Sequence, residues 1–318
     1  GYYGCRRCME SRMDSLLSKW RKVISQLGNI PYLSIVPQPE MKDFTTWKVG
    51  GKVLALVEVK SGENLDQVIS LCEEEGIEWR VLGRGSNILV KDEGFPGVVI
   101  KLGGEFRELK REGGYIEGGA GVPLPRLVNF ALEECLGGME FLVGVPGTVG
   151  GAVRINAGCF GGEIGSIVEK VEVRKKNGKR EWLKRDDLCF SYRHSNLKKE
   201  KTVILKAVFG LFPENREVLE KRTRKFSCLR KERQPLEWPS AGSVFLNPEG
   251  DSAARIIEGM GFKGLRLGRA QVSSKHSNFI INLGGAKSRE IEYLINWVQK
   301  EIYINKGVWL EREVELWS

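Results

Sequence analysis

The chain has 318 residues, of which 41% are hydrophobic and 29% charged, and its formal net charge is +9. This length suits two or three domains, and no run reaches the roughly 18 apolar residues of a membrane-spanning helix. Seven scattered cysteines favour a reducing cytoplasm, and we expect no secretory leader. The basic excess suits a nucleic acid or a small polyanion, but no RNA-binding motif is present, so we expect no nucleic-acid partner.

In chain order, the first predicted element is an amphipathic helix over residues 16–27, capped by Asp14 or Ser15 and packed on the body of the protein. From residue 44 onward, short strands alternate with helices, and this order predicts an α+β fold. Helices are predicted at 64–72, 124–135, 251–258 and 288–302, with a long basic helix after residue 215, and strands at 79–82, 98–101, 167–174, 181–183, 203–208, 243–246, 279–282 and 309–316.

Two of these elements carry a more specific prediction. Asn177-Gly178 lies between the strands predicted at 167–174 and 181–183, and this dipeptide is typical of a type I′ hairpin turn. In the basic segment 216–233, Lys and Arg alternate with Glu, which is typical of a solvated helix face with i,i+4 ion pairs. The segment therefore does not by itself indicate a nucleic-acid site.

The most informative part of the sequence is the run 142–162, in which seven of the 21 residues are glycine. Glycine costs about 0.5–1 kcal/mol relative to Ala inside a helix or strand, so this density predicts backbone that turns through positive φ or approaches a ligand closely. A second loop, 82–90, offers backbone N–H groups, the Ser86 hydroxyl and the Asn87 amide as a nest for an anion. A third glycine loop spans 118–121. The run 142–162 is either part of a cofactor cradle or an unusually long turn.

Several common chemistries are excluded by the motifs that are missing. The two histidines, His194 and His276, lie too far apart for a zinc motif on one helix, and we expect no metal site. The sequence has no Gly-x-Ser-x-Gly elbow, no phosphate-binding P-loop and no Rossmann fingerprint. Three glycine loops without these patterns favour a dinucleotide held mostly by backbone. The alternative is a set of glycine-rich turns in a tight β-sheet.

Seven motifs follow one another along the chain, at residues 45–51, 83–87, 144–152, 156–158, 190–193, 241–248 and 310–314. Their order resembles that of the UDP-N-acetylenolpyruvoylglucosamine reductases, the MurB flavoenzymes of peptidoglycan synthesis. The resemblance covers roughly residues 41–316, and the short spacing from Arg193 to Ser243 resembles the compact class of the family. Arg154 departs from the pattern, because an apolar or aromatic residue is expected there, and the N-terminal extension has no counterpart.

The resemblance implies an α+β protein with a two-subdomain FAD-binding module (PCMH/MurB-like) and a C-terminal α+β substrate-binding domain. We divide the chain into an N-terminal extension (1–40), FAD-binding subdomains (41–105 and 106–213), a UDP-sugar domain (214–306) and a C-terminal strand that returns to the active site (307–318). It further implies a cytoplasmic monomer or weak oligomer with no membrane insertion.

The implied activity is the NADPH-dependent reduction of UDP-N-acetylglucosamine enolpyruvate to UDP-N-acetylmuramate through non-covalently bound FAD. In this family scheme, hydride reaches C3 of the enolpyruvyl group and a proton reaches C2. The resemblance makes Ser243 the proton donor, Arg193 the cation that holds the carboxylate and enolate oxygen, and Glu313 an acid that holds or protonates the enol. Without the resemblance, Ser243 would only form hydrogen bonds with the backbone and Arg193 would pair with Asp186 or Asp187. Glu313 would face water.

The resemblance also implies the binding residues. Substrate contacts are expected from Asn247 and Gln234, with Arg233 as an electrostatic helper, while His276 either lines the cleft or is a hydrogen-bonded scaffold residue. The cofactor-binding residues are expected in the three glycine loops: Gly83, Arg84, Gly85, Ser86, Asn87, Ile88, Gly119, Ala120, Gly147, Thr148, Gly150, Gly151, Asn156, Ala157 and Gly158.

Two other functions remain open from the sequence. One is another FAD-dependent oxidase or dehydrogenase on the same fold, with O2 as electron acceptor. Such enzymes often attach flavin covalently, and Cys159 is the only thiol near the main glycine run. The other is a basic scaffold that binds nucleic acid, which predicts a colourless protein and a steep salt dependence of RNA affinity.

Overall fold

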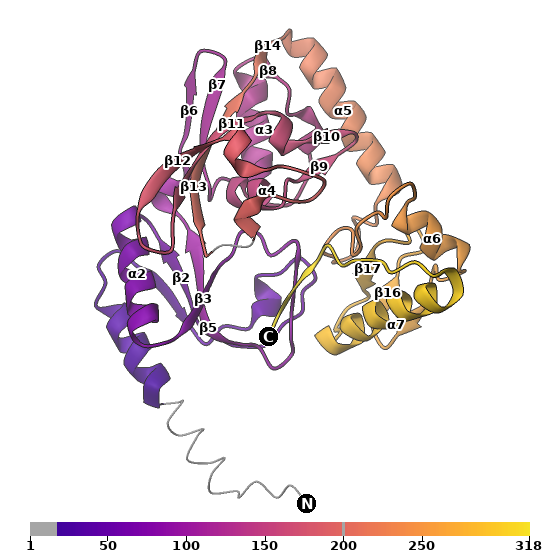
Figure 1. The fold of residues 1–318 in the computed structure, drawn as a ribbon, viewed down its shortest axis with the longest axis horizontal. Coiled ribbons are helices and arrows are strands. Elements are labelled where there is room, and N and C mark those ends of the chain that lie inside the picture. Colours follow the sequence, from indigo (N-terminus) through magenta and orange to yellow (C-terminus); the bar gives the residue numbers. More distant parts are fainter. Residues whose placement is uncertain (1–17, 199–200) are drawn as a thin grey trace, which may run out of the picture.

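Figure 1 shows the computed structural model, which describes residues 18–198 and 201–318 as three lobes. The first described element is a helix over residues 18–28, which lies beside the first sheet. Val23 and Leu27 on its inner face are fully buried in the largest core cluster, so this helix packs on the body, as predicted. Its expected caps, Asp14 and Ser15, and Cys5 and Cys8 lie outside the described residues.

The first lobe is built on a four-stranded sheet with the order β1-β2-β5-β3. Its centre is parallel, because β5 pairs in parallel with both β2 and β3. The central strand β2 is apolar almost throughout, as expected for a parallel strand covered on both faces. Helix α2 (Gly62–Glu74) covers this sheet and is capped by the Ser61 side chain. The strands are β1 (Ser34–Pro37), β2 (Val53–Val59), β3 (Glu78–Val81) and β5 (Phe95–Leu102).

The second lobe is an antiparallel five-stranded sheet with the order β12-β11-β13-β7-β6. Helices α3 (Leu124–Glu133) and α4 (Val149–Arg154) lie beside this sheet, and α4 contacts its middle strand β13. The strands are β6 (Leu109–Glu112), β7 (Tyr115–Gly119), β11 (Val168–Arg174), β12 (Arg180–Lys184) and β13 (Val203–Gly210).

The β11–β12 hairpin forms where it was predicted, but its turn is not type I′. A backbone hydrogen bond from Gly178 N to Lys175 O closes the turn at 2.9 Å, which makes Lys176 and Asn177 its central residues. A type I′ turn needs positive φ at both central residues, and neither has it, whereas Gly178 follows with φ +81°. Gly178 therefore provides the left-handed residue that follows a type I turn in a longer hairpin loop.

The third lobe has its own core, and the long helix α5 (Arg216–Arg233) leads into it. A segment of the first lobe takes part in that core, because Trp47 is fully buried there and its indole N–H donates to Ile280 O at 2.7 Å. Asn282 donates back to Trp47 O at 2.9 Å. The remaining elements of this lobe are α6 (Ala253–Gly259), α7 (Ser288–Lys306), β15 (Arg266–Leu267), β16 (Ala270–Val272) and β17 (Ile280–Asn282).

The C-terminal segment crosses from the third lobe back to the first, where β18 (Glu315–Trp317) pairs in parallel with β4 (Ile88–Val90). The strand predicted at 309–316 is therefore wrong in extent. The strand predicted at 243–246 does not form either, and an isolated bridge between Phe245 and Arg312 joins the two segments. Two small ladders complete the fold: β8 (Leu136–Gly137) with β14 (Phe212–Pro213), and β9 (Gly158–Cys159) with β10 (Gly162–Glu163).

The predicted α+β fold is confirmed, with mixed helices and sheets in three lobes. Element boundaries differ by a few residues. For example, the helix predicted from residue 251 begins at Ala253, because the Ser252 side chain caps it by accepting from Arg255 N. No described helix is long and apolar enough to cross a membrane.

Candidate active site

A cleft runs between the lobes, formed by two cavities of about 890 and about 500 Å³. These volumes lie within the range typical of cofactor and ligand sites. The cavities share part of their lining, including Gly83, Thr148, Arg154 and Trp317, so they are neighbouring parts of one cleft. The larger part lies against the two sheets, and the smaller part reaches the third lobe through Gln234, Ser243 and His276.

The loop over residues 83–88 lines the smaller part, and its backbone donors are free. Within the described chain, none of the N–H groups of residues 83–87 donates to a protein acceptor. The loop is nevertheless held: Thr46 N donates to Gly85 O at 3.1 Å, and the Ser86 hydroxyl donates to Pro146 O at 2.7 Å. Five successive free donors in a fixed loop form a backbone nest for an anion.

The side chains of Ser86 and Asn87 do not serve this nest in the way the sequence suggests. Ser86 ties the loop to the glycine run through Pro146. The Asn87 amide donates to Glu313 O at 3.2 Å, and Asn87 O accepts from Glu315 N at 3.0 Å. Both side chains therefore shape the cleft through protein contacts, and the anion donors are backbone.

The other glycines of the cradle permit close packing. A Cβ on Gly83 would lie 2.7 Å from Thr148 Oγ1, and Thr148 in turn caps α4 by accepting from Gly151 N. A Cβ on Gly150 would lie 2.9 Å from the Ala120 Cβ, and one on Gly119 would lie 2.2 Å from Phe106 O. These glycines let the three loops meet. Gly83 and Gly150 also line the cleft, as do Gly151, Ala120 and Gly147.

A group of cationic side chains lines the larger part of the cleft. Arg84, Lys101, Arg107 and Arg126 all contribute to its wall. Burial lowers the pKa of Lys101, and the positive charges of Arg107 and Arg84 lower it further, against the opposing effect of Glu58. A bound polyanion would stabilise the charged form of a lysine that is partly desolvated among like charges.

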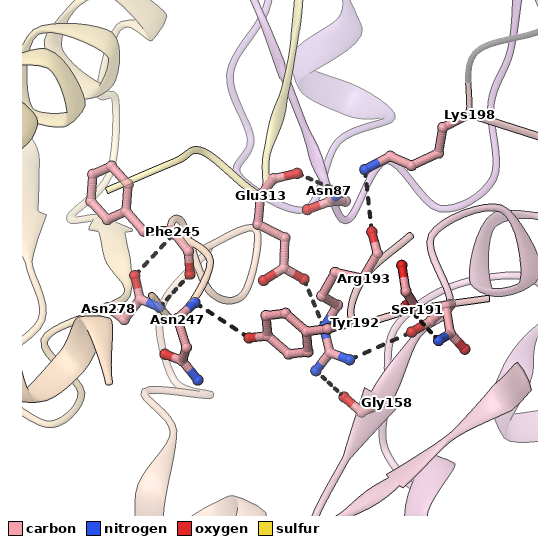
Figure 2. Close-up of polar contacts among 11 residues, drawn as sticks. Asn87, Gly158, Ser191, Tyr192, Arg193, Lys198, Phe245, Asn247, Asn278 and Glu313 are labelled. Carbon is pink, nitrogen blue, oxygen red and sulfur yellow. Dashed lines mark hydrogen bonds and ion pairs between the residues drawn. The ribbon is translucent and has the colours of Figure 1, made fainter. Parts of the chain in front are cut away.

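Arg193 occupies the tip of a tight turn in which Ser191 and His194 exchange backbone hydrogen bonds. Its φ of +52° is left-handed, which is uncommon for a residue other than glycine. Figure 2 shows its guanidinium directed at Gly158 O, to which it donates at 2.6 Å, and at Glu313, with Nε 3.2 Å from Oε1. The expected surface pair with Asp186 or Asp187 is not formed.

Asn156 positions this turn from beneath. It is fully buried at φ +48°, its amide donates to Ser191 O at 2.8 Å, and its Oδ1 accepts from Gly165 N. Its side chain is absent from the lining of the cleft, whereas Ala157 and Gly158 are part of it. Asn156 therefore supports Arg193 within the protein.

Glu313 faces Arg193 from the C-terminal segment, and its side chain is 13% exposed. Burial raises its pKa, and this effect outweighs the lowering by Arg193 and Lys198. Its backbone is fixed on both sides of the cleft: Glu313 N donates to Val244 O at 2.8 Å, and Asn87 donates to Glu313 O. Glu313 does not face bulk water, and its carboxyl group lies largely buried against Arg193.

Ser243 lies beside Glu313, because the segments that carry them are joined at Val244 and by the Phe245–Arg312 bridge. Asn278 fixes the Ser243 segment through reciprocal contacts with Phe245, donating to its carbonyl at 2.8 Å and accepting from its N–H at 3.0 Å. The Ser243 hydroxyl lines the cleft and has no hydrogen-bond partner among the described residues. It therefore does not merely bond backbone.

The residues expected to bind substrate are only partly brought together. Arg233, Gln234 and His276 line the smaller part of the cleft. Burial lowers the pKa of His276, and its Nδ1 accepts from Asn278 N at 3.2 Å. Asn247 is exposed outside this lining, where its Oδ1 accepts from Ala253 N at 3.0 Å.

Three further residues belong to the site and were not assigned from the sequence. Tyr192 accepts from Asn247 N at 3.4 Å and so joins the FAD module to the third lobe. Arg230 is largely buried in the wall of the cleft, and it donates to Gln234 Oε1 at 2.8 Å. The Lys198 ammonium donates to Arg193 O at 3.4 Å. Tyr192 lies inside a matching motif, but nothing in the local sequence around Lys198 or Arg230 marks these contacts.

Comparisons with known proteins assign this arrangement to a class. A family model described as FAD binding domain matches residues 53–184, and one described as UDP-N-acetylenolpyruvoylglucosamine reductase, C-terminal domain, matches residues 234–317. The fold and cleft are those of an FAD-dependent oxidoreductase. The free N–H groups of the 83–87 loop and the cationic wall fit the diphosphate of this cofactor.

Similarity over nearly the whole chain identifies the family. The chain is 42% identical over 289 residues to the UDP-N-acetylenolpyruvoylglucosamine reductase of Caldicellulosiruptor saccharolyticus, covering 90% of this chain and 92% of that protein. It is 42% identical over 299 residues to that of Carboxydothermus hydrogenoformans, covering 94% and 98%. The crystal structure of the MurB reductase from Thermus caldophilus matches with a TM-score of 0.80 and 38% identity, covering 90% and 100%. The chain belongs to the UDP-N-acetylenolpyruvoylglucosamine reductase family, as its motifs suggested.

Proposed function

We propose that this chain reduces the enolpyruvyl group of UDP-N-acetylglucosamine enolpyruvate with NADPH, giving UDP-N-acetylmuramate for peptidoglycan synthesis. The observation that carries the proposal is one cleft wall. There the unpartnered Ser243 hydroxyl, the Arg193 guanidinium and the raised-pKa carboxyl of Glu313 lie beside the 83–88 loop. A general acid, an anion-binding fork and a second acid are the groups that this reduction needs.

Three segments of the chain are proposed to hold FAD: residues 83–88, residues 119–120 and the glycine run from Gly147 to Gly158. Their backbone donors and close-packed glycines support this role. When bound, FAD supplies the hydride chemistry, taking hydride from NADPH and delivering it to C3 of the enolpyruvyl group. The protein supplies position and charge for the rest of the reaction.

Each catalytic side chain answers one demand of the reduction. Arg193 offers a planar, permanently charged fork to the substrate carboxylate, and the Gly158 carbonyl orients this fork. Glu313, which faces Arg193 across 3.2 Å, holds or protonates the enol as negative charge grows on it. Ser243 transfers its hydroxyl proton to C2, which is basic enough at that stage to accept it. The new C–H bonds at C3 and C2 then account for the hydride and the proton that the enolpyruvyl group gains.

The third lobe is proposed to bind the sugar nucleotide. Gln234 contacts the diphosphate with Arg233 as its electrostatic helper, and His276 lines the same wall as a hydrogen-bonding group. Asn247 would reach the substrate only after releasing Ala253 N. The net charge of +9 favours both polyanionic substrates by steering, an effect that salt weakens.

An absorbance experiment tests the proposal directly. Purified protein, reconstituted with FAD if necessary, is expected to be yellow, to bleach on anaerobic addition of NADPH, and to recolour on addition of the enolpyruvyl nucleotide. A flavin that only O2 reoxidises would favour the oxidase alternative. FAD that remains attached to denatured protein would point to a covalent bond, with Cys159 as the first candidate.

Several finer statements belong to the same proposal. We place the protein in the cytoplasm, as a monomer or weak oligomer without nucleic-acid partners, and we retain the domain division at residues 40, 105, 213 and 306. Sedimentation at several protein concentrations tests the oligomeric state. Retention of RNA at about 0.2 M salt would contradict the absence of a nucleic-acid partner.

A further inference from the structure

Residues 195–198, which closely follow Arg193 in the chain, are held by hydrogen bonds to Arg154 of the FAD-binding module. The Ser195 hydroxyl donates to Arg154 O at 2.6 Å. The Arg154 guanidinium reaches back and donates to Leu197 O at 3.4 Å and to Lys198 O at 3.2 Å. Arg154 is the α4 residue that departs from the family pattern, and here it fixes the main chain of Lys198. The base of the Lys198 side chain is therefore held on a rigid element.

The Lys198 side chain extends from this segment to the tight turn over residues 191–194, here called the catalytic turn. Its Nζ donates to the carbonyl oxygen of Arg193 at 3.4 Å, as Figure 2 shows. Arg193 has left-handed backbone at φ +52°, which only surrounding contacts can maintain in a residue with a side chain. Gly158 and Glu313 hold the Arg193 guanidinium, and Lys198 holds its peptide. The side chain and backbone of Arg193 are thus fixed from different directions.

Lys198 also brings charge to the same corner. Glu313 is largely buried, and two cations act on its carboxyl group, Arg193 at 3.2 Å and Lys198 from the opposite end of the catalytic turn. Both lower the pKa of Glu313 against the rise caused by burial. The other charged or titratable groups that line this part of the cleft are Arg84, Arg154, Cys159, Arg230, Arg233, His276 and Glu315.

We propose that Lys198 is a positioning residue for the reduction: it holds the Arg193 peptide so that the guanidinium faces Glu313, and it brings a second positive charge to this corner of the cleft. This inference rests on the proposed function. Lys198 itself is absent from the lining of the cleft, and it acts through Arg193 and Glu313.

The test compares the pH dependence of one half-reaction in three variants and the wild type. Enzyme reduced by NADPH is mixed with the enolpyruvyl nucleotide, and flavin reoxidation is followed from about pH 6 to about pH 10. Lys198→Met removes the donor and the charge, Lys198→Arg keeps both, and Lys179→Met is the matched control on an exposed hairpin turn. Lys198→Gln keeps a donor without the charge and replaces Lys198→Met if that variant does not fold.

In the wild type, the rate is expected to fall at high pH as Glu313 loses its proton. In Lys198→Met, this alkaline limb moves to higher pH, because a charge that lowers the pKa of Glu313 is gone. The rate below the limb falls about tenfold, because Arg193 is held less firmly. Lys198→Arg restores the wild-type limb, Lys179→Met leaves it unchanged, and in a Glu313→Gln background Lys198→Met moves no limb.

Two outcomes would overturn the inference, and they are distinguishable. If the wild-type flavin is reoxidised by the nucleotide but the limb of Lys198→Met stays at its wild-type pH, Lys198 does not act on Glu313, whatever happens to the rate. If the nucleotide does not reoxidise the wild-type flavin at all, the proposed function fails and the role of Lys198 fails with it.

Discussion

The cofactor cradle and the catalytic corner face the same cleft but are built in opposite ways. The cradle is made of backbone: free N–H groups at residues 83–87, and glycines whose added Cβ atoms would collide with neighbouring loops. The catalytic corner is made of side chains from three distant segments, which carry Arg193, Ser243 and Glu313. The cofactor cradle therefore depends on local backbone conformation, whereas the catalytic corner depends on how the lobes are joined.

This difference predicts separate consequences for mutation. Changes in the cradle should alter FAD affinity before they alter chemistry. Changes in the corner should leave FAD bound and reducible, and they should slow only the step that consumes the enolpyruvyl nucleotide.

Ser243→Ala is expected to slow flavin reoxidation by the nucleotide about a thousandfold, as loss of a general acid does. Reduction of the flavin by NADPH should stay within about twofold of the wild-type rate, because no proton from Ser243 is needed there. Stopped-flow absorbance measures both half-reactions. Equal losses in the two would remove Ser243 from the role of proton donor.

Arg193→Lys is expected to slow the same half-reaction about a hundredfold. An ammonium cannot reproduce the two-pronged contact of a guanidinium, and the hydrogen bond to Gly158 O would be lost or weakened. FAD affinity, measured by flavin fluorescence, should not change. Unaltered turnover of the nucleotide would show that Arg193 only supports the fold.

Gly85→Ala is expected to weaken FAD binding about 5- to 150-fold, the equivalent of the roughly 1–3 kcal/mol typical of overpacking. Gly85 has φ +63°, and an added Cβ would lie 2.3 Å from Phe44 O. The matched control is Gly259→Ala, where nothing lies within 4 Å of the added Cβ and φ is not left-handed. Fluorescence titration of apoprotein with FAD compares them, and equal affinities would contradict a backbone cradle.

Glu313→Gln is expected to change the pH dependence of stability slightly. Burial raises the pKa of Glu313 in the folded protein. As pH rises, Glu313 therefore loses its proton at a lower pH in the unfolded chain than in the folded protein. The free energy of unfolding therefore falls as pH rises from the ordinary range of a glutamate through the folded pKa. The glutamine side chain of the variant carries no such proton, and the fall should be smaller. Urea unfolding at several pH values measures the difference between the two proteins, and parallel curves would contradict the raised pKa.

The sequence predicted the cradle better than the corner for a physical reason. Glycine clustering is local, and it signals positive φ and close approach wherever it occurs, as at Gly85 and Gly150. Nothing local to Glu313 shows that a carboxyl group near the end of the chain faces Arg193. Only the order of family motifs joined these two residues, and their 3.2 Å contact depends on the crossing of the C-terminal segment.

Local propensity also misjudged details that tertiary contacts decide. Asn177-Gly178 suggested one turn, but the hairpin closes one residue earlier and leaves only Gly178 left-handed. The residues near 243 and 309 have the composition of strands, but Asn278 and isolated backbone contacts hold them without a regular ladder. Asn87 lines the cleft as expected for a binding residue, and the sequence did not indicate that its amide also secures the Glu313 backbone.

The exchange of segments between the first and third lobes bears on how the molecule unfolds. Trp47 completes the core of the third lobe, and β18 completes a ladder in the first, so each of these lobes contains a part of the other. Neither can be excised without exposing apolar surface or leaving a strand unpaired. Denaturation should consequently be a single cooperative transition, and loss of either crossing segment should destabilise regions far from it.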